Sequence, residues 1–168
     1  TGAAFDADGR LAQAGRADCA RLDRWLAHPY FRQPPPKSLD RDAFAGLLAE
    51  LEGLGAADGA ATLAAFTAAS FGRARAFQRL PPRRWLLAGG GRHNGVLAAL
   101  IAEAVAAPVA PVEAVGWRGD ALEAEAFAFL AVRSLKGLPL SLPTTTGVPA
   151  PPPGGRLWLP GSTAPPAA

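Results

Sequence analysis

Apolar residues recur at intervals of three and four along much of the chain, which is the spacing of one helix face. Helices are predicted over residues 17–27, 41–51, 58–78, 94–106 and 120–136. Ser38 or Asp40 is expected to cap the second helix and Asp58 the third, because such side chains accept hydrogen bonds from the first free N–H groups of a helix. Gly137 is expected to end the last helix.

Two short apolar runs interrupt this helical pattern. Residues 84–88 lead into three glycines before the helix from 94, and residues 108–112 are extended. Strands that alternate with helices are typical of a parallel α/β unit. A parallel sheet needs several paired strands and cover on both faces, so two strands are too few for this many apolar helices. We therefore expect the missing strands upstream of Thr1.

Composition agrees with a partial fold. The 168 residues are 49% hydrophobic, which is enough for one ordinary domain with a core, yet the chain contains no Met and opens on Thr-Gly-Ala-Ala. We expect the back part of a longer protein, with residues 1–147 as its folded lobe. Residues 148–168 are rich in Pro and Gly and are predicted to be a tail. Leu157 and Trp158 are the residues through which this tail could dock on the folded lobe.

Charge and cysteine content narrow the function classes. The net charge is only +3, and the arginines do not form a basic face interleaved with aromatic residues, which argues against nucleic acid as a partner. The single Cys19 forms no internal disulfide, and no Cys/His cluster has the spacing of metal ligands. The longest apolar run, residues 126–132, is far below the roughly 20 residues that cross a bilayer. We expect a soluble, cytoplasmic protein with no membrane partner.

Three glycines, Gly89, Gly90 and Gly91, lie at the junction of the first predicted strand and its following helix. There the backbone can approach a nucleotide closely while helix N–H groups face an anion. A tight turn with Asn94 as the N-cap explains the same residues equally well. The run is not a Walker loop, because no Gly-Lys-Ser or Gly-Lys-Thr follows it. It is not G-x-G-x-x-G either, because Asn94 stands where the third glycine would be. We assign no catalytic role to His93, because a lone histidine beside a turn is more often a hydrogen-bond partner.

The helix predicted over 120–136 carries two carboxylates between apolar faces. Successive residues turn by about 100°, so Glu123 shares a face with Phe127 while Glu125 points nearly opposite. The helix is predicted to be largely buried, and a buried carboxylate is costly unless it is paired or lines a cleft. Glu123 or Glu125 is therefore a site candidate. The alternative is a surface edge, where the helix dipole favours acidic residues in the first turn.

A second candidate site follows three prolines, which make residues 33–38 an extended connector. Lys37 and Ser38 at its end could present a cation and a hydroxyl to an anionic ligand. A solvated lysine beside a capping serine is the simpler interpretation, and we favour it.

A series of short motifs runs from Phe5 to Gly147 in one order. They are Phe5-Asp6-Ala7-Asp8-Gly9, His28-Pro29-Tyr30-Phe31, Pro35-Pro36-Lys37-Ser38, Ala61-Thr62-Leu63 with Thr67-Ala68, Gly89-Gly90-Gly91-Arg92-His93-Asn94, Gly116-Trp117-Arg118-Gly119-Asp120, Glu123-Ala124-Glu125-Ala126-Phe127-Ala128, and Gly137-Leu138-Pro139 through Thr146-Gly147. Each motif is weak alone, but the ordered set resembles the C-terminal part of the anhydro-N-acetylmuramic acid kinases of bacterial cell-wall recycling.

That resemblance implies an α/β fold, namely the C-terminal lobe of an actin-like (ribonuclease H-like) ATPase fold that is helix-rich and has an incomplete parallel sheet. It also implies ATP and Mg²⁺, an amino sugar as the second substrate, and a homodimer as a further expectation. The implied reaction opens the 1,6-anhydro ring of anhydro-N-acetylmuramic acid with water and phosphorylates O6, which gives N-acetylmuramic acid 6-phosphate. We expect this chain to be inactive alone, because the family's phosphate loop and the aspartate that acts as base would precede Thr1.

The resemblance also assigns roles to particular residues. Gly89, Gly90, Gly91 and Asn94 match the loop that closes over the nucleotide, and Glu123 matches a glutamate that helps to hold the attacking water or the sugar. The family's Lys-Ser-Thr-Gly-Arg motif reads Lys-Ser-Leu-Asp-Arg over residues 37–41, so substrate contacts from this segment are the weakest assignment. A non-catalytic nucleotide-binding or regulatory module is the alternative function, and a dinucleotide-binding oxidoreductase fragment is disfavoured because no acidic residue follows at the required spacing.

Overall fold

The computed structural model describes residues 2–158, which divide into two compact units, one up to Leu122 and one from Glu123 on. The helices of the first unit are α1 (Arg10–Gln13), α2 (Cys19–Leu26), α3 (Leu47–Glu50), α4 (Ala56–Arg75) and α5 (Gly95–Val105), with short 3₁₀ helices at Ala7–Gly9, Pro29–Arg32, Arg41–Phe44, Gly90–His93 and Val112–Val115. Its strands are β1 (Trp85–Leu87) and β2 (Val109–Pro111).

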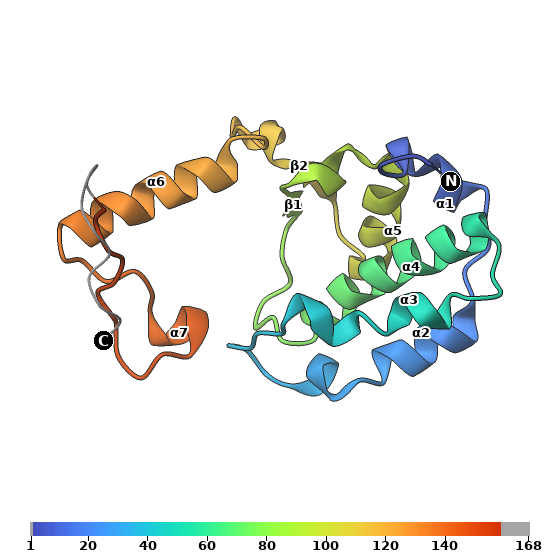
Figure 1. Cartoon of the computed structure of the whole chain (residues 1–168), viewed down its shortest axis with the longest axis horizontal. Helices are drawn as coiled ribbons and strands as arrows, with labels where there is room; N and C mark the ends of the chain where they lie inside the picture. Colours follow the sequence, from blue (N-terminus) through green and yellow to red (C-terminus); the bar gives the residue numbers. More distant parts are fainter. Residues whose placement is uncertain (1, 159–168) are drawn as a thin grey trace. The chain divides into compact units, whose positions relative to one another are not determined.

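The two strands pair in parallel, with Trp85 opposite Val109 and Leu87 opposite Pro111. They are joined through α5, so this part of the chain is one β-α-β crossover (Figure 1). Both predicted strands and the helix between them are confirmed. Within the described residues the fold is a helix-rich α/β arrangement with a two-stranded parallel sheet.

Two apolar clusters hold the first unit together. One lies where α4, α5 and β1 meet, and its buried members are Ala68, Leu87, Ile101 and Val105. The other is aromatic and joins α2, the Pro29–Arg32 turn and α4 through Trp25, Phe31 and Phe66. In the aromatic cluster the ring of Phe66 lies 5.4 Å from that of Trp25 and 5.9 Å from that of Phe31, both edge-on. These contacts fix α4 as the central helix of the unit (Figure 1).

Two predictions about helix boundaries are wrong. The helix expected over 41–51 is divided into a 3₁₀ turn and α3, with Gly46 between them. Glycine loses more backbone entropy than other residues when it becomes helical, which disfavours one continuous helix through Gly46. Asp40, not Ser38, caps its start by accepting from the Asp42 N–H at 2.8 Å. Asp58 does not cap α4, which begins at Ala56; its carboxylate accepts from the Arg16 N–H at 2.7 Å instead.

The second unit contains most of α6 (Leu122–Leu135) and all of α7 (Pro143–Thr146). The predicted helix over 120–136 is confirmed, but its predicted burial is wrong, because no residue of α6 is buried. Phe127 and Phe129 are each more than 60% exposed. The apolar faces have no second layer to pack against among the described residues of this unit.

The segment after Gly147 is attached to the second unit through its backbone. Pro152 accepts from the Leu140 N–H at 2.9 Å, and Gly154 accepts from the Ser134 hydroxyl at 2.5 Å. Leu157 and Trp158, the residues expected to dock this tail, are both more than half exposed, so that expectation is wrong within the described residues. Residues 159–168 of the predicted tail lie outside them.

Within residues 2–158, no helix has the length and apolar character needed to cross a bilayer.

Candidate functional site

The glycine turn after β1 leads directly into α5. Gly89 has φ +74° and ψ 178°, a conformation that strongly favours glycine, and the chain then forms the 3₁₀ turn Gly90–His93. Asn94 caps α5, because its side-chain oxygen accepts from the Leu97 N–H at 2.8 Å. The predicted strand, glycine turn and capped helix are therefore confirmed as structure.

The backbone does not require glycine at the next two positions. Neither Gly90 nor Gly91 has a positive φ. A Cβ built on Gly90 would meet nothing within 4 Å, and one built on Gly91 would make only an ordinary contact, at 3.6 Å, with the Leu97 side chain. Glycine at positions 90 and 91 therefore leaves open space beside the turn, and it is not needed to avoid a clash inside the fold.

That space forms part of a cavity of about 590 Å³. Its lining residues are Phe5, Asp6, Gly90, Gly91, His93 and Asn94. Cavities of this size commonly hold small organic ligands. The cavity brings Gly90, Gly91 and Asn94 together with a motif near the start of the chain that sequence reasoning had given no role.

Contacts with the glycine turn and with α1 hold the segment from Phe5 to Gly9 in place. A Cβ on Gly9 would collide with the Asn94 side chain and lie 2.7 Å from Cβ of Val96, so only glycine allows this close approach. The Asp6 carboxylate accepts from the Leu11 N–H at 2.8 Å and from the Ala12 N–H at 3.0 Å. This doubly bound carboxylate anchors the segment to the first turn of α1.

Arg92 holds the glycine turn in place through its buried side chain. Its side chain is only 2% exposed, donates to the Gly89 carbonyl at 3.0 Å and to Glu113 Oε1 at 2.9 Å, and lies 2.7 Å from Asp120 Oδ1. A Cβ on Gly119 would collide with both the Arg92 guanidinium and the Glu113 carboxylate, so any side chain at this position would displace the ion pair. A buried guanidinium with several carboxylate and carbonyl partners holds its neighbours in one geometry.

Both carboxylates of this network favour their charged forms. The hydrogen bond and the charge of Arg92 lower the pKa of Asp120 below its usual value. The pKa of Glu113 is lowered first by a hydrogen bond from its own backbone N–H and then by Arg92. The ion pairs are therefore intact at neutral pH, and they connect the glycine turn to the segment that enters α6.

Sequence reasoning missed this network. The motif Gly89–Asn94 was interpreted through its glycines and its terminal Asn94, and Asp120 only as part of an ordered motif. The available signal was an arginine directly after three glycines, since an arginine that becomes buried in such a turn needs anionic partners. His93, which was given no catalytic role, is exposed, with its Nε2 3.7 Å from Asp120 Oδ1.

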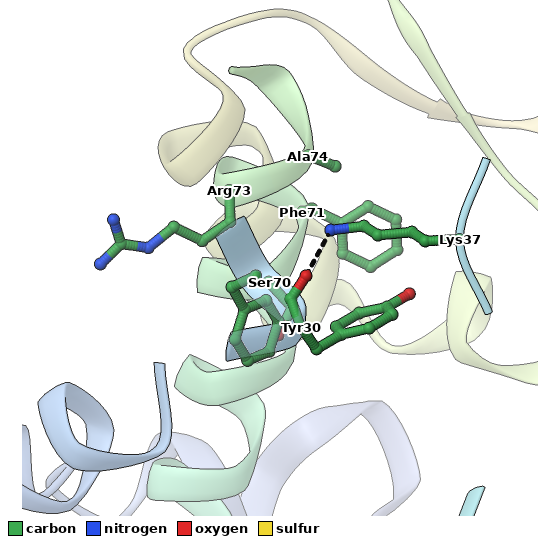
Figure 2. A pocket seen from close by; sticks show the side chains of 7 residues that line it. Tyr30, Lys37, Ser70, Phe71, Arg73 and Ala74 are labelled. Carbon is green, nitrogen blue, oxygen red and sulfur yellow. Dashed lines mark hydrogen bonds between the residues drawn. The ribbon is translucent and has the colours of Figure 1, made fainter. Parts of the chain in front are cut away.

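Lys37 lies in a different cavity, which shares no lining residue with the one at the glycine turn (Figure 2). This cavity has a volume of about 230 Å³ and lies between the Pro29–Arg32 turn and the last turns of α4. The Lys37 ammonium donates to the Tyr30 carbonyl at 2.8 Å and lies 4.3 Å from the centre of the Tyr30 ring. Figure 2 shows the Arg73 guanidinium pointing away from that ammonium.

These contacts give Lys37 a structural role as the residue that ties the proline connector to the body of the unit. Ser38 is exposed and does not line the cavity. The structure thus gathers Gly90, Gly91 and Asn94 around one cavity and leaves Lys37 and Ser38 outside it.

Glu123 is an exposed residue in the first turn of α6, and Glu125 is partly buried. Both belong to the second unit, so the role of Glu123 stays a prediction. Among residues 2–158 no three His, Cys, Asp or Glu side chains come together as a metal site, and both Asp6 oxygens are engaged by α1. The described residues therefore do not by themselves form a Mg²⁺ site.

A parallel β-α-β crossover with a glycine turn at its first strand end belongs to the class of α/β proteins that place ligands at the carboxyl ends of their strands. A sequence model of the anhydro-N-acetylmuramic acid kinase family matches residues 1–156. The chain belongs to this family, and the resemblance that its ordered motifs indicated is confirmed.

Curated relatives agree with the family match. The chain is 63% identical to an anhydro-N-acetylmuramic acid kinase of Acidiphilium cryptum over 98% of its own length and 46% of that protein. It is 59% identical to the Rhodospirillum rubrum protein of the same name over 94% of its length and 41% of that protein. The chain therefore spans less than half the length of these relatives.

Proposed function

We propose that this chain supplies the nucleotide-binding lobe of an ATP-dependent kinase that opens 1,6-anhydro-N-acetylmuramic acid with water and phosphorylates its O6. The observation that carries the proposal is the cavity beside the glycine turn, where Gly90 and Gly91 leave space that the fold itself does not need. Relatives at 54–63% identity that carry the name of this kinase support the choice of reaction.

Within that proposal, residues 1–147 form the C-terminal lobe of a two-lobed, actin-like fold, and residues 148–168 form its tail. Two observations support an additional lobe. The chain spans 46% of the Acidiphilium cryptum relative, and the apolar faces of α6 are exposed within the described unit. In this proposal the other lobe covers α6 and removes that apolar surface from water.

The proposed reaction consumes one water and one ATP for each sugar. The oxygen of a water molecule bonds to C1 of the sugar while the C1–O6 bond breaks, and O6 bonds to the γ-phosphorus of ATP while ADP leaves. The proton of the water passes to a base that we place in the other lobe. Glu123 holds the attacking water or the sugar, and the glycine turn with Asn94 holds the nucleotide near the N-terminus of α5. Mg²⁺ would neutralise phosphate charge.

Lys37 and Ser38 remain the weakest candidates for contact with the sugar. The ammonium of Lys37 is already engaged by Tyr30, and neither residue lines the cavity at the glycine turn.

One observation favours a second candidate function, a nucleotide-binding module without catalysis. The described residues that line the cavity lie between Phe5 and Asn94, inside the first unit, and none of them belongs to α6. Calorimetric titration of the 168-residue chain with ATP separates the two functions. Binding with no activity in any longer form favours the module.

The reaction is tested in a fused protein that joins the part of the Acidiphilium cryptum relative that this chain does not match to residues 1–168. With anhydro-N-acetylmuramic acid and ATP present, we expect ADP release that depends on the sugar. The unfused chain is the matched control and is expected to release none. Absence of sugar-dependent ADP release from a folded fusion would contradict the proposed reaction.

Replacing Gly90 with alanine tests the use of the space beside the turn. We expect Gly90→Ala to weaken ADP binding to the fused protein about tenfold or more, because the new methyl group occupies the ligand's space. The free energy of unfolding should stay the same or rise by about 0.5 kcal/mol, since the position has open space and no positive φ.

Gly46→Ala is the matched control, since Gly46 has φ −62° and also has nothing within 4 Å of a built Cβ. Its ADP affinity should equal that of the unsubstituted protein. Equal ADP affinities for Gly90→Ala and Gly46→Ala would show that the space beside the glycine turn is not used by the nucleotide.

A further inference from the structure

Phe5 is an exposed aromatic residue at the rim of the cavity beside the glycine turn. Its side chain is 77% exposed, although a phenylalanine of this exposure leaves a large apolar surface in water. It lines the cavity together with Gly90 and Gly91. Among the described residues, no core packing covers this ring.

The backbone around Phe5 is nevertheless held firmly. The next residue, Asp6, accepts two backbone N–H groups of α1 at 2.8 and 3.0 Å, and Gly9 fits tightly against the Asn94 side chain. An aromatic ring is thus placed at a cavity by a fixed segment while the ring itself stays uncovered. Such pre-positioned, uncovered rings are suited to stack on a flat ligand.

The composition of the cavity wall limits the kind of ligand group that lies there. Among the described residues that line the cavity there is no lysine or arginine, so this part of the wall offers no side-chain cation to a phosphate. It offers the Phe5 ring, the His93 imidazole and a stretch of backbone without side chains at Gly90 and Gly91. An aromatic ring beside glycine backbone matches a planar, uncharged heterocycle, which can stack on the ring and lie against the backbone of the two glycines.

We propose that Phe5 stacks on the nucleobase of the bound nucleotide, with the base lying between its ring and the glycine turn. This inference rests on the proposed function, since it assigns the base end of the same nucleotide. It makes Phe5 a binding residue whose contribution depends on the base and not on the phosphates.

The test measures ADP affinity by calorimetry in the fused protein and in three variants of it. Phe5→Ala is expected to weaken ADP binding about tenfold or more. Phe5→Trp is expected to bind ADP as tightly as the unsubstituted protein, because tryptophan offers a stacking face of at least equal size. Leu80→Ala is the matched control, since Leu80 is 79% exposed and lies outside the cavity wall. Inorganic pyrophosphate, which has no base, should bind Phe5→Ala as it binds the unsubstituted protein.

The outcomes separate this inference from the proposed function. If the unsubstituted fused protein binds no ADP, the proposed function fails and the assignment of Phe5 fails with it. If that protein binds ADP and Phe5→Ala binds it equally well, only the stacking role is overturned. An equal loss of ADP and pyrophosphate affinity in Phe5→Ala would also overturn the stacking role, because Phe5 would then only maintain the shape of the site.

Discussion

Glu123→Gln in the fused protein should slow sugar-dependent ADP release by about a hundredfold or more while ADP affinity stays unchanged. The substitution keeps the size of the side chain but removes its charge, so a carboxylate that orients the attacking water or the sugar no longer does so. Glu123 is exposed in the first turn of α6 and contributes little to packing there, so the fold should survive the change. Steady-state kinetics together with ADP titration measure both effects.

Glu125→Gln is the control that decides between the two carboxylates of α6. It carries the same chemical change two residues further along the same helix. Because the predicted role falls on Glu123 and not on Glu125, the control should keep most of the activity. A large loss in Glu125→Gln with little loss in Glu123→Gln would show that the sequence-based choice between these residues is wrong.

Phe66→Ala should cost the largest amount of stability, about 3–5 kcal/mol in the free energy of unfolding. Phe66 is 9% exposed, and its ring lies 5.4 Å from the rings of both Trp25 and Phe44. Removing the ring leaves a cavity at the place where α2, the Pro29–Arg32 turn and α4 meet. Chemical denaturation of the 168-residue chain measures the loss.

Phe5→Ala provides the matched comparison, because the same atoms are removed from a ring that is 77% exposed. Its free energy of unfolding should change by no more than about 0.5 kcal/mol. If Phe66→Ala and Phe5→Ala had equal effects, the aromatic cluster would not be the core of the first unit.

The crossover could be predicted from the sequence because its signals are local. A short apolar run, three glycines and a helical pattern that begins at Asn94 are enough to place β1, the turn and α5. The Asn94 cap was one of two interpretations of that residue, and its hydrogen bond to the Leu97 N–H confirms the cap. The cap and the cavity occur together, so the two interpretations do not exclude each other.

The rest of the candidate site depends on contacts between distant segments, which local patterns do not contain. Arg92 meets Glu113 and Asp120, which lie more than twenty residues further along, and Phe5 reaches the glycine turn across more than eighty. The burial of α6 was misjudged for a related reason. The apolar periodicity of α6 predicts that the helix needs a partner surface, but it does not indicate which part of a protein supplies that surface.

The most direct test of the central claim is the mass of the product that the fused protein makes from anhydro-N-acetylmuramic acid and ATP. The proposed reaction adds one water and one phosphoryl group to each sugar, so a product with both additions should accumulate as fast as ADP. A sugar that gains water alone would contradict phosphorylation at O6. A sugar that gains a phosphoryl group alone would contradict the hydrolytic ring opening, and an unchanged sugar would contradict the kinase activity itself.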